Sequence, residues 1–262
     1  MAPSLADTRL AGLPYLSAEE LNALAGCAAS RRIVSAGSEL AHEGDATESL
    51  TFLEVGWACQ YTTTRDGRRQ ISALLLPGDV CNLDALPFGK LDGGVRMLTS
   101  GTMLSVPRDR VAALVATSAG IAQAFIWLGA VENAILSRRT LCLGRLSARE
   151  RMAHLLCELA VRLGFNNDEG EVSFDMPLTQ EQLADVLGLT AVHVNRTLLQ
   201  LRRDGLLTST KRVVGICDVA ALRLAGEFQP GYLHARGLPN DPALDQRETD
   251  SPGILDSWRG LR

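Results

Sequence analysis

The pattern of apolar and polar positions changes character at Pro107. Before it, short β-type runs alternate with glycine-containing turns roughly every ten residues, which is typical of a β-sandwich, barrel or roll. RDGR at 65–68 predicts a hairpin with a type I′ turn, because that turn needs positive φ at both central residues. The runs that we expect to be strands are 50–55, 57–64, 70–76 and 97–106.

After Pro107 the apolar period becomes helical, with a short helix predicted at 108–116 and Ser118 as the cap of a long helix to about residue 145. An apolar stripe with 3-and-4 spacing runs along the long helix. Two interpretations stay open, packing on its own domain or a seam shared with a second copy, and we expect the seam. The predicted dimer residues are Ile121, Ala124, Phe125, Leu128, Val131 and Ile135.

Two capping boxes mark further helices. Ser147 with Glu150 opens a helix to about Arg162, and Thr179 with Gln182 opens a shorter one. Gly188 permits a sharp turn, and Thr190 can cap the helix that follows. Residues 178–207 therefore read as two short helices joined by a tight hinge.

The second helix of this pair has two unlike faces. Val194, Leu198 and Leu201 repeat at i, i+4 and i+7, so we expect them to point inward. The opposite face suits a DNA groove, because it lacks bulk and carries an arginine whose paired donors match guanine O6 and N7. That face comprises Ala191, Val192, Asn195 and Arg196, with His193 to the side.

The alternative is an ordinary helical hairpin with a solvated arginine face. The sequence that follows favours DNA binding, because 206–210 and 213–217 resemble two strands around a basic tip, Lys211–Arg212. Such a wing is placed to contact phosphate. We therefore expect double-stranded DNA as a partner, bound largely through salt-sensitive phosphate contacts.

Overall charge does not indicate this partner, because the 262-residue chain has a net charge of −4 and a pI near 5.6. The prediction rests on local charge. Residues 178–212 hold five Arg or Lys against three Asp or Glu, and 138–151 hold five arginines against one glutamate.

Several other classes of protein find little support. The six cysteines include no CxxC pair, which argues against zinc and disulfides and for reduced cytoplasmic thiols. The start has no secretory signal pattern. Residues 111–131 carry no charge over the length of a membrane span, but the TSAG within them predicts a helix end and a new cap, so we expect no membrane partner. We find no GxSxG, HExxH or GxxxxGK motif and expect no enzyme.

The residues resemble a known family. AGSELAHEGD (36–45), FLEVGWACQYTTTRDGRR (52–69) and LLPGDV (75–80) are similar to the sensor domain of bacterial transcription regulators related to the cyclic-AMP receptor protein and the fumarate–nitrate regulator, the Crp/Fnr family. LTQEQLADVLGLTAVHVNRTLLQLRRDGLL (178–207) is similar to their winged helix-turn-helix. The resemblance spans about residues 20–228.

The resemblance implies an α+β fold with an N-terminal antiparallel β-roll, a long dimerisation helix and a C-terminal winged helix-turn-helix. It also implies a homodimer on a palindromic site, with recognition helices about one DNA turn apart. We expect RNA polymerase as a further partner. The expected divisions are an N-terminal segment 1–22, the roll 23–117, the long helix 118–145, the DNA-binding domain 146–228 and a flexible tail 229–262.

Matching to the family assigns individual roles. Arg196 falls at the base-reading arginine, while Ala191 and Val192 stand where relatives place further contacts and cannot hydrogen-bond a base edge. His193 and Asn195 become substitute readers or phosphate contacts. The predicted DNA site is Thr179, Gln180, Thr190, Ala191, Val192, His193, Asn195, Arg196, Lys211 and Arg212.

The roll departs from the family's cyclic-nucleotide binders, which carry a Gly-Glu pair and then Arg-Ser or Arg-Thr. Here Asn82–Leu83 and Asp92–Gly93 stand at those places, and an aspartate would repel a phosphate. Arg96 is the nearby cation. We therefore expect that the roll does not bind cyclic AMP in the usual way, and the candidate effector pocket is Leu83, Asp92, Gly93 and Arg96.

The effector itself stays unassigned. Iron–sulfur relatives use a tight N-terminal cysteine cluster, whereas this chain has Cys27 alone in that region, so we expect no such cluster. Haem-binding relatives make His42 and His154 candidate ligands. The alternative function is thus a regulatory module that responds to a cyclic nucleotide or to haem.

Overall fold

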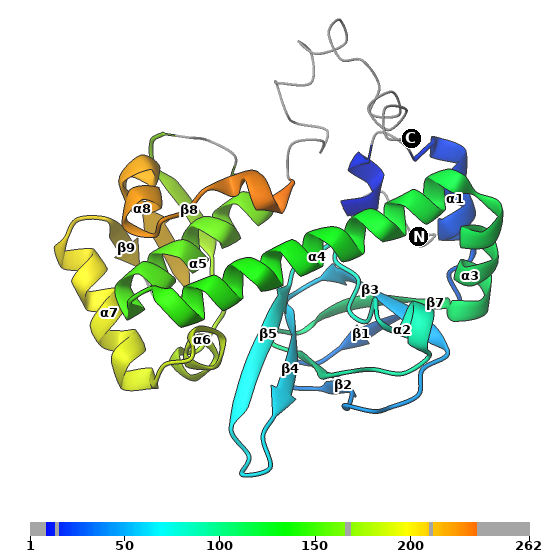
Figure 1. The fold of residues 1–262 in the computed structure, drawn as a ribbon, viewed down its shortest axis with the longest axis horizontal. Helices are drawn as coiled ribbons and strands as arrows, with labels where there is room; N and C mark the ends of the chain where they lie inside the picture. Colours follow the sequence, from blue (N-terminus) through cyan, green and yellow to red (C-terminus); the bar gives the residue numbers. More distant parts are fainter. Residues whose placement is uncertain (1–8, 14–15, 166–168, 210–211, 235–262) are drawn as a thin grey trace, which may run out of the picture.

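A β-roll and a helical C-terminal domain are bridged by one long helix, α4 (Ala119–Arg145), which crosses the whole molecule (Figure 1). This computed structural model describes residues 9–13, 16–165, 169–209 and 212–234. The predicted α+β fold, with a roll, a long helix and a winged helix-turn-helix, is confirmed.

The roll consists of two antiparallel sheets that face one another. The predicted run 97–106 is two strands rather than one, because the chain turns at 98–100 between them. Two short strands at 30–34 and 39–41 add one edge to each sheet. The first sheet has the order β1 (Ser30–Val34), β7 (Gly101–Pro107), β3 (Ser49–Val55), and the second β2 (Glu39–Ala41), β6 (Gly94–Met97), β4 (Ala58–Thr63), β5 (Arg69–Leu75).

Both faces of the β3–β7 pair are buried. Leu53 and Met103 point between the sheets, whereas their neighbours Phe52 and Leu104 point to the opposite face, as the period of two requires. That outer face packs on α1 (Ala18–Gly26), α3 (Arg108–Thr117) and the first half of α4. The roll is thereby held against the helix that continues to the C-terminal domain.

The predicted hairpin between β4 and β5 is confirmed, but its predicted turn type is wrong. Gly67 has φ +84°, whereas Asp66 is not among the non-glycine residues with positive φ. Gly67 N donates to Thr64 O at 2.9 Å, and Thr64 N donates to Arg68 O at 2.9 Å. A longer loop with a single left-handed glycine closes the hairpin, so only one residue needs positive φ.

Short helices cover the end of the roll. α1 spans residues 22 and 23, between which we expected the N-terminal segment to end and the roll to begin. α2 (Ala85–Phe88) follows β5. Ser118 caps α4 as expected, because its Oγ accepts from Ile121 N at 3.1 Å, and it also donates to Glu20 of α1. α1 is therefore tied to the start of α4, and a single turn, η1 (Arg9–Gly12), precedes α1.

The apolar stripe of α4 faces its own chain, which corrects its assignment to a seam between two copies. Its first four members pack on the outer face of the roll. The last two join a cluster with β4, β5 and the C-terminal domain. All are at most 7% exposed in one chain: Ile121, Ala124, Phe125, Leu128, Val131 and Ile135.

One helix among the described residues, α4, is long and apolar enough to meet the length and composition of a membrane span. The same apolar stripe is the part that packs against the roll. Burial against the roll therefore accounts for one side of this helix, while Ile126 on another side is exposed.

The C-terminal domain surrounds α5 (Ala148–Arg162), whose capping box of Ser147 and Glu150 is present as predicted. After α8 (Val219–Ala225) the chain continues into the single turn η2 (Pro230–Leu233), where Leu233 is fully buried. Residues 229–234, which the sequence assigned to a flexible tail, are therefore packed on the domain, and the rest of that assignment, from 235, lies outside the described residues.

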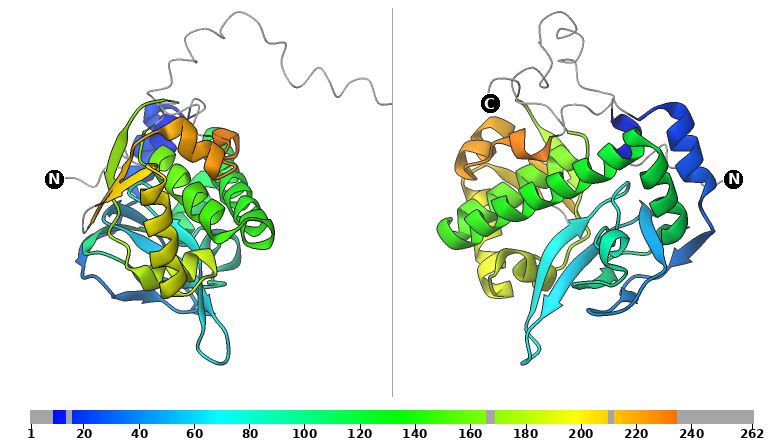
Figure 2. Two further views of the ribbon diagram at one scale, coloured as in Figure 1. Left: turned by 90° about the vertical axis from the view of Figure 1, so that its left-hand side faces the viewer. Right: turned by 45° about the vertical axis from the view of Figure 1, so that its right-hand side comes forward.

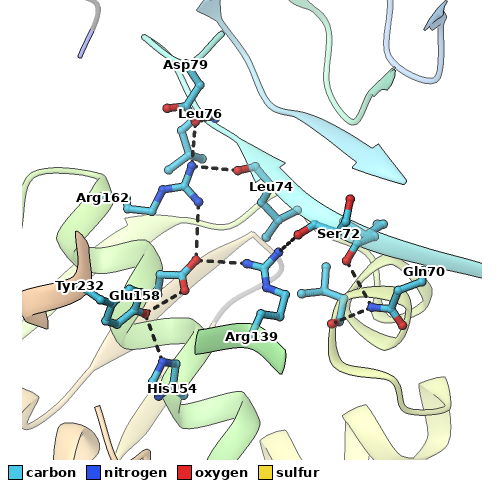
Figure 3. A network of polar contacts seen from close by, with 12 residues as sticks. Gln70, Ser72, Leu74, Leu76, Asp79, Arg139, His154, Glu158, Arg162 and Tyr232 are labelled. Atoms are coloured by element: carbon cyan, nitrogen blue, oxygen red, sulfur yellow. Dashed lines mark hydrogen bonds and ion pairs between the residues drawn. The ribbon is translucent and has the colours of Figure 1, made fainter. Parts of the chain in front are cut away.

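A buried charged network joins the roll to the C-terminal domain (Figure 3). Glu158 of α5 lies 3.1 Å from Arg139 of α4 and 3.6 Å from Arg162, and Arg162 reaches Asp79 of the roll at 2.7 Å. Tyr232 of η2 donates to Glu158 at 2.9 Å. Elements from four parts of the chain meet here, with all four charged side chains at most 8% exposed.

The two arginines also hold the backbone of β5. Arg139 donates to Ser72 O at 2.5 Å, and Arg162 donates to Leu74 O at 2.9 Å. Burial opposes ionisation of Glu158, but Arg139 and Arg162 outweigh burial and lower the pKa of this carboxyl. Since each charge has partners, the network fixes how the two domains sit relative to one another.

We expect the substitution Glu158→Gln to destabilise the fold by about 3–5 kcal/mol, because it leaves two buried guanidiniums without their shared carboxylate. The free energy of unfolding, measured by chemical denaturation, checks this. The matched control is Glu54→Gln, which removes the partner of the half-exposed Arg31 on the roll. It should cost far less because solvent screens that pair. Equal losses for the two variants would contradict the assigned role of the network.

Candidate nucleic-acid interface

Two short helices with a tight turn form the centre of the candidate site. α6 (Gln180–Leu187) begins with the predicted capping box, in which Thr179 N donates to Gln182 Oε1 at 2.8 Å and Gln182 N to Thr179 Oγ1 at 3.1 Å. α6 ends at Gly188, whose φ of +61° lies in the left-handed region. A Cβ at this position would lie 3.1 Å from Leu143 Cδ2, so both conformation and space favour glycine.

The second helix, α7 (Ala191–Arg203), is anchored by its inner face. Val194 and Leu201 are fully buried and Leu198 is nearly so, as the period predicted, while Thr197 is buried beside them. α7 packs on both α5 and α6. At its start Thr190 Oγ1 accepts from His193 N at 3.3 Å, so the cap is the one predicted.

The outer face of α7 is open to solvent. Val192, His193, Asn195 and Arg196 are exposed, and Ala191 is partly exposed. Within the described residues, Arg196 has no carboxylate partner. α7 lies at the end of the molecule remote from α1 and α3, and comes forward when that end faces the viewer (Figures 1 and 2).

The wing is present as a small antiparallel sheet. Its order is β8 (Val172–Asp175), β10 (Val213–Ile216), β9 (Leu207–Ser209), and β8 was missed because its four residues followed a loop-like run. Arg212 is exposed beside β10, and its carbonyl accepts from Met176 N at 2.7 Å. Lys211 lies outside the described residues.

Arginines in 138–151 contribute less free charge than the sequence suggested. Arg139 belongs to the buried network. Arg149 pairs with Asp204 at the end of α7 at 2.7 Å, and Arg151 donates to Leu146 O and Leu187 O at 2.8 and 2.9 Å. Three of the five side chains therefore brace the helices.

The β4–β5 hairpin of the roll reaches across to α6. Arg69 lies 2.6 Å from Asp185, and Gln70 Nε2 donates to Val186 O at 3.2 Å. A hollow of about 960 Å³ lies between the hairpin, α6 and the turn that leads into α7. Sequence reasoning missed this contact, because its partners are 116 residues apart and no local pattern pairs them.

The four candidate effector residues have different partners. Arg96 pairs with Glu39 beside the hairpin, whereas Leu83 packs among apolar residues close to Gly129 of α4. Asp92 N donates to Asp84 at 3.0 Å, and a Cβ on Gly93 would lie 3.0 Å from Tyr61 O. None of the four is among the residues that line a hollow of about 220 Å³ in the roll, beside Cys81, Asn82 and Leu91.

Asn82, at the place of the glycine in the family's Gly-Glu pair, has a structural role. Its side chain is buried, accepting from Thr51 N at 2.8 Å and donating to Ser49 O at 2.9 Å. Both bonds go to the backbone of β3. The amide is thereby occupied in holding the turn after β5 against the sheet.

The candidate haem ligands differ in their surroundings. Both ring nitrogens of His154 are engaged, with Nδ1 2.9 Å from Gly226 O and Nε2 3.1 Å from the Tyr232 hydroxyl. Burial lowers the pKa of His154. His42 is exposed in a roll loop. Among the described residues no cluster of three or more His, Cys, Asp or Glu side chains could hold a metal ion.

Each of the two parts of the chain matches a known protein family. Residues 150–225 match a family described as the Crp-like helix-turn-helix domain, and residues 31–118 match the cyclic nucleotide-binding domain. The transcriptional activator protein FnrL of Cereibacter sphaeroides is 32% identical over 207 residues, covering 77% of this chain and 83% of FnrL.

A further relative and a solved structure are similar to this chain over a comparable length. Electron transport regulator A of Shewanella oneidensis is 26% identical over 215 residues, covering 81% of this chain and 85% of the relative. The solved structure of FixK2 from Bradyrhizobium japonicum superposes with a TM-score of 0.67 at 26% identity, covering 76% of this chain and 96% of FixK2.

We expect the substitution Gly188→Ala to destabilise the helix pair by about 1–2 kcal/mol, because alanine is strained in the left-handed region. Thermal or chemical unfolding of the variant measures this. The matched control is Gly188→Asn, which also adds a Cβ facing Leu143 but tolerates this conformation better. Equal destabilisation by alanine and asparagine would show that crowding, rather than backbone strain, sets the cost.

Proposed function

The chain belongs to the Crp/Fnr family of transcription regulators, and from that premise we propose that it acts as a cytoplasmic homodimer that binds a palindromic DNA site through two copies of α7. The observation that carries the proposal is the pair of opposed faces on α7. Its buried side is locked into the domain, while Asn195 and Arg196 stand exposed on the other. A rigid helix with outward donors suits the major groove.

Individual side chains take distinct parts in this proposal. Arg196 reads guanine through its paired donors, and Asn195 and His193 supply polar contacts near it. Thr179 and Gln180, at the start of α6, and Arg212 with Lys211 in the wing contact phosphate. Thr190 and Ala191 bring the start of α7 close to the duplex, because neither side chain is bulky.

The dimer seam of the proposal is the outward side of α4 rather than the buried stripe. Exposed positions recur there with alternating spacings of three and four, which is the repeat of a coiled-coil seam. Ile126 is 72% exposed at this side, a costly position for an isoleucine in a lone chain. The exposed positions of the repeat are Gln123, Ile126, Ala130, Asn133, Ser137 and Thr140.

The roll serves in this proposal as a sensor or scaffold that sets the angle between the two DNA-binding domains. The occupied amide of Asn82 and the separate positions of Leu83, Asp92 and Arg96 support a roll that does not take cyclic AMP in the usual way. The engaged ring of His154 argues against haem ligation through that residue. The name of FnrL as a transcriptional activator supports RNA polymerase as a further partner.

The experiment that tests the proposed function is selection of bound sequences from random duplex DNA by the purified full chain. A palindromic motif with half-sites about one helical turn apart is the expected result, because a two-fold dimer presents two equivalent helices. Recovery of no motif at low salt, or of a single half-site, would overturn the proposal of a dimer on a palindrome.

We expect Arg196→Ala to weaken binding to the selected site by about 1–3 kcal/mol and to relax selectivity at one base position per half-site. Titration against the selected site and its single-base variants measures both effects. The control is Arg110→Ala, an exposed arginine on α3 of the roll's far end. If the Arg196 variant keeps the selectivity of the parent, this side chain is not the base reader.

We expect Ala130→Glu to convert the dimer to a monomer, because two carboxylates would then face one another across the seam. Sedimentation or light scattering gives the mass. Ala112→Glu adds the same charge on the exposed side of α3 and should leave the mass unchanged. A dimer that persists in the Ala130 variant would place the interface elsewhere.

A further inference from the structure

An apolar side chain stands where the DNA-facing side of α7 should be polar. Val192 is 69% exposed in the first turn of α7, and Leu199, seven residues further on, is 42% exposed on the same side. Together with polar neighbours they line one outward hollow of about 390 Å³. Its lining residues are Val192, Asn195, Arg196, Leu199, Gln200 and Arg203.

Neither helix formation nor core packing explains valine at position 192. A β-branched residue lowers helix propensity relative to alanine, and the side chain buries little surface within the chain. An exposed apolar residue is ordinary when it stands alone on a surface. This one stands beside the donors of Asn195 and Arg196, on the side of α7 proposed to face the bases.

We propose that Val192 reads the 5-methyl group of a thymine in each half-site. The inference rests on the proposed entry of α7 into the major groove. The thymine methyl is the one apolar group that the four bases present there, and valine offers two methyls with no donor or acceptor. A single χ1 rotamer dominates for valine in a helix, so these methyls are held in place before DNA binds.

The position of the thymine follows from the helix geometry. Val192 and Arg196 are four residues apart, a rise of about 6 Å along α7. Base steps are about 3.4 Å apart along one strand. The thymine therefore lies within about two base steps of the guanine that Arg196 reads. Asn195, three residues after Val192, is suited to the adenine edge of the same or the next base pair.

The test removes the methyl group from DNA and the side chain from the protein. Each thymine of the selected site is replaced in turn by deoxyuridine, which lacks only the 5-methyl, and the Kd is measured at constant salt. We expect one position per half-site at which the parent loses about fourfold in affinity, the value of one buried methyl-sized group. Val192→Ala, whose side chain lacks both γ-methyls, should show a much smaller difference between the two DNAs at that position.

Two further variants sharpen the outcome. Val192→Glu should select cytosine at the same position, because a carboxylate accepts from the cytosine amino group. Val55→Ala truncates an exposed valine of the roll and should keep the full fourfold sensitivity. Position 192 is exposed and alanine favours helix, so these variants are expected to fold, which thermal unfolding checks.

The results separate the two proposals. A palindromic site bound equally well with uracil at every thymine, or a Val192→Ala variant that stays as sensitive to the methyl as the parent, would overturn thymine reading and leave the DNA-binding regulator standing. Failure of the parent to bind any duplex would overturn both.

Discussion

The shared carboxylate of Glu158 is the interaction on which the arrangement of the molecule depends. It lies between the guanidiniums of Arg139 and Arg162, which belong to consecutive helices, and Arg162 continues to Asp79 of the roll. Each ion is deeply buried, so each is tolerable only while its partners are in place. A small rotation of one domain against the other would separate these charges, which makes the joint a discrete position rather than a soft hinge.

This joint decides where the DNA-facing helix can point. α5 carries Glu158 and also packs against the inner face of α7, so the network and the outward residues share one rigid support. The hairpin contact of Arg69 with Asp185 adds a second connection from the roll to α6. An effector that altered the roll would therefore act on α7 through these two connections. A second arrangement of the two domains would require new partners for the charged side chains of both connections.

The long helix has a double role that explains its composition. Its inward stripe from Ile121 to Ile135 is buried in the chain's own core, while Ile126 and Ala130 on the outward side are exposed. An isoleucine as exposed as Ile126 is better placed against a partner than in water. The proposed second copy of the chain is that partner.

Local sequence determined most elements and both ends of the helix pair. Ser118, Thr179 and Gly188 act through neighbours within a few residues, so capping and turn geometry could be read directly from the chain. The same holds for the two faces of α7, because helical periodicity alone separates Val194 from Arg196. The turn type at 65–68 could not be predicted from the sequence, since one dipeptide is compatible with hairpin loops of different length.

Only the tertiary structure decided which partner each face and charge would meet. Periodicity shows that Ile121 and its followers are buried, but not whether the roll or a second chain buries them. The pairing of Arg69 with Asp185, or of Arg162 with Asp79, joins residues more than eighty positions apart. Burial and charge are local properties that a sequence displays, whereas the choice among partners depends on how the whole chain packs.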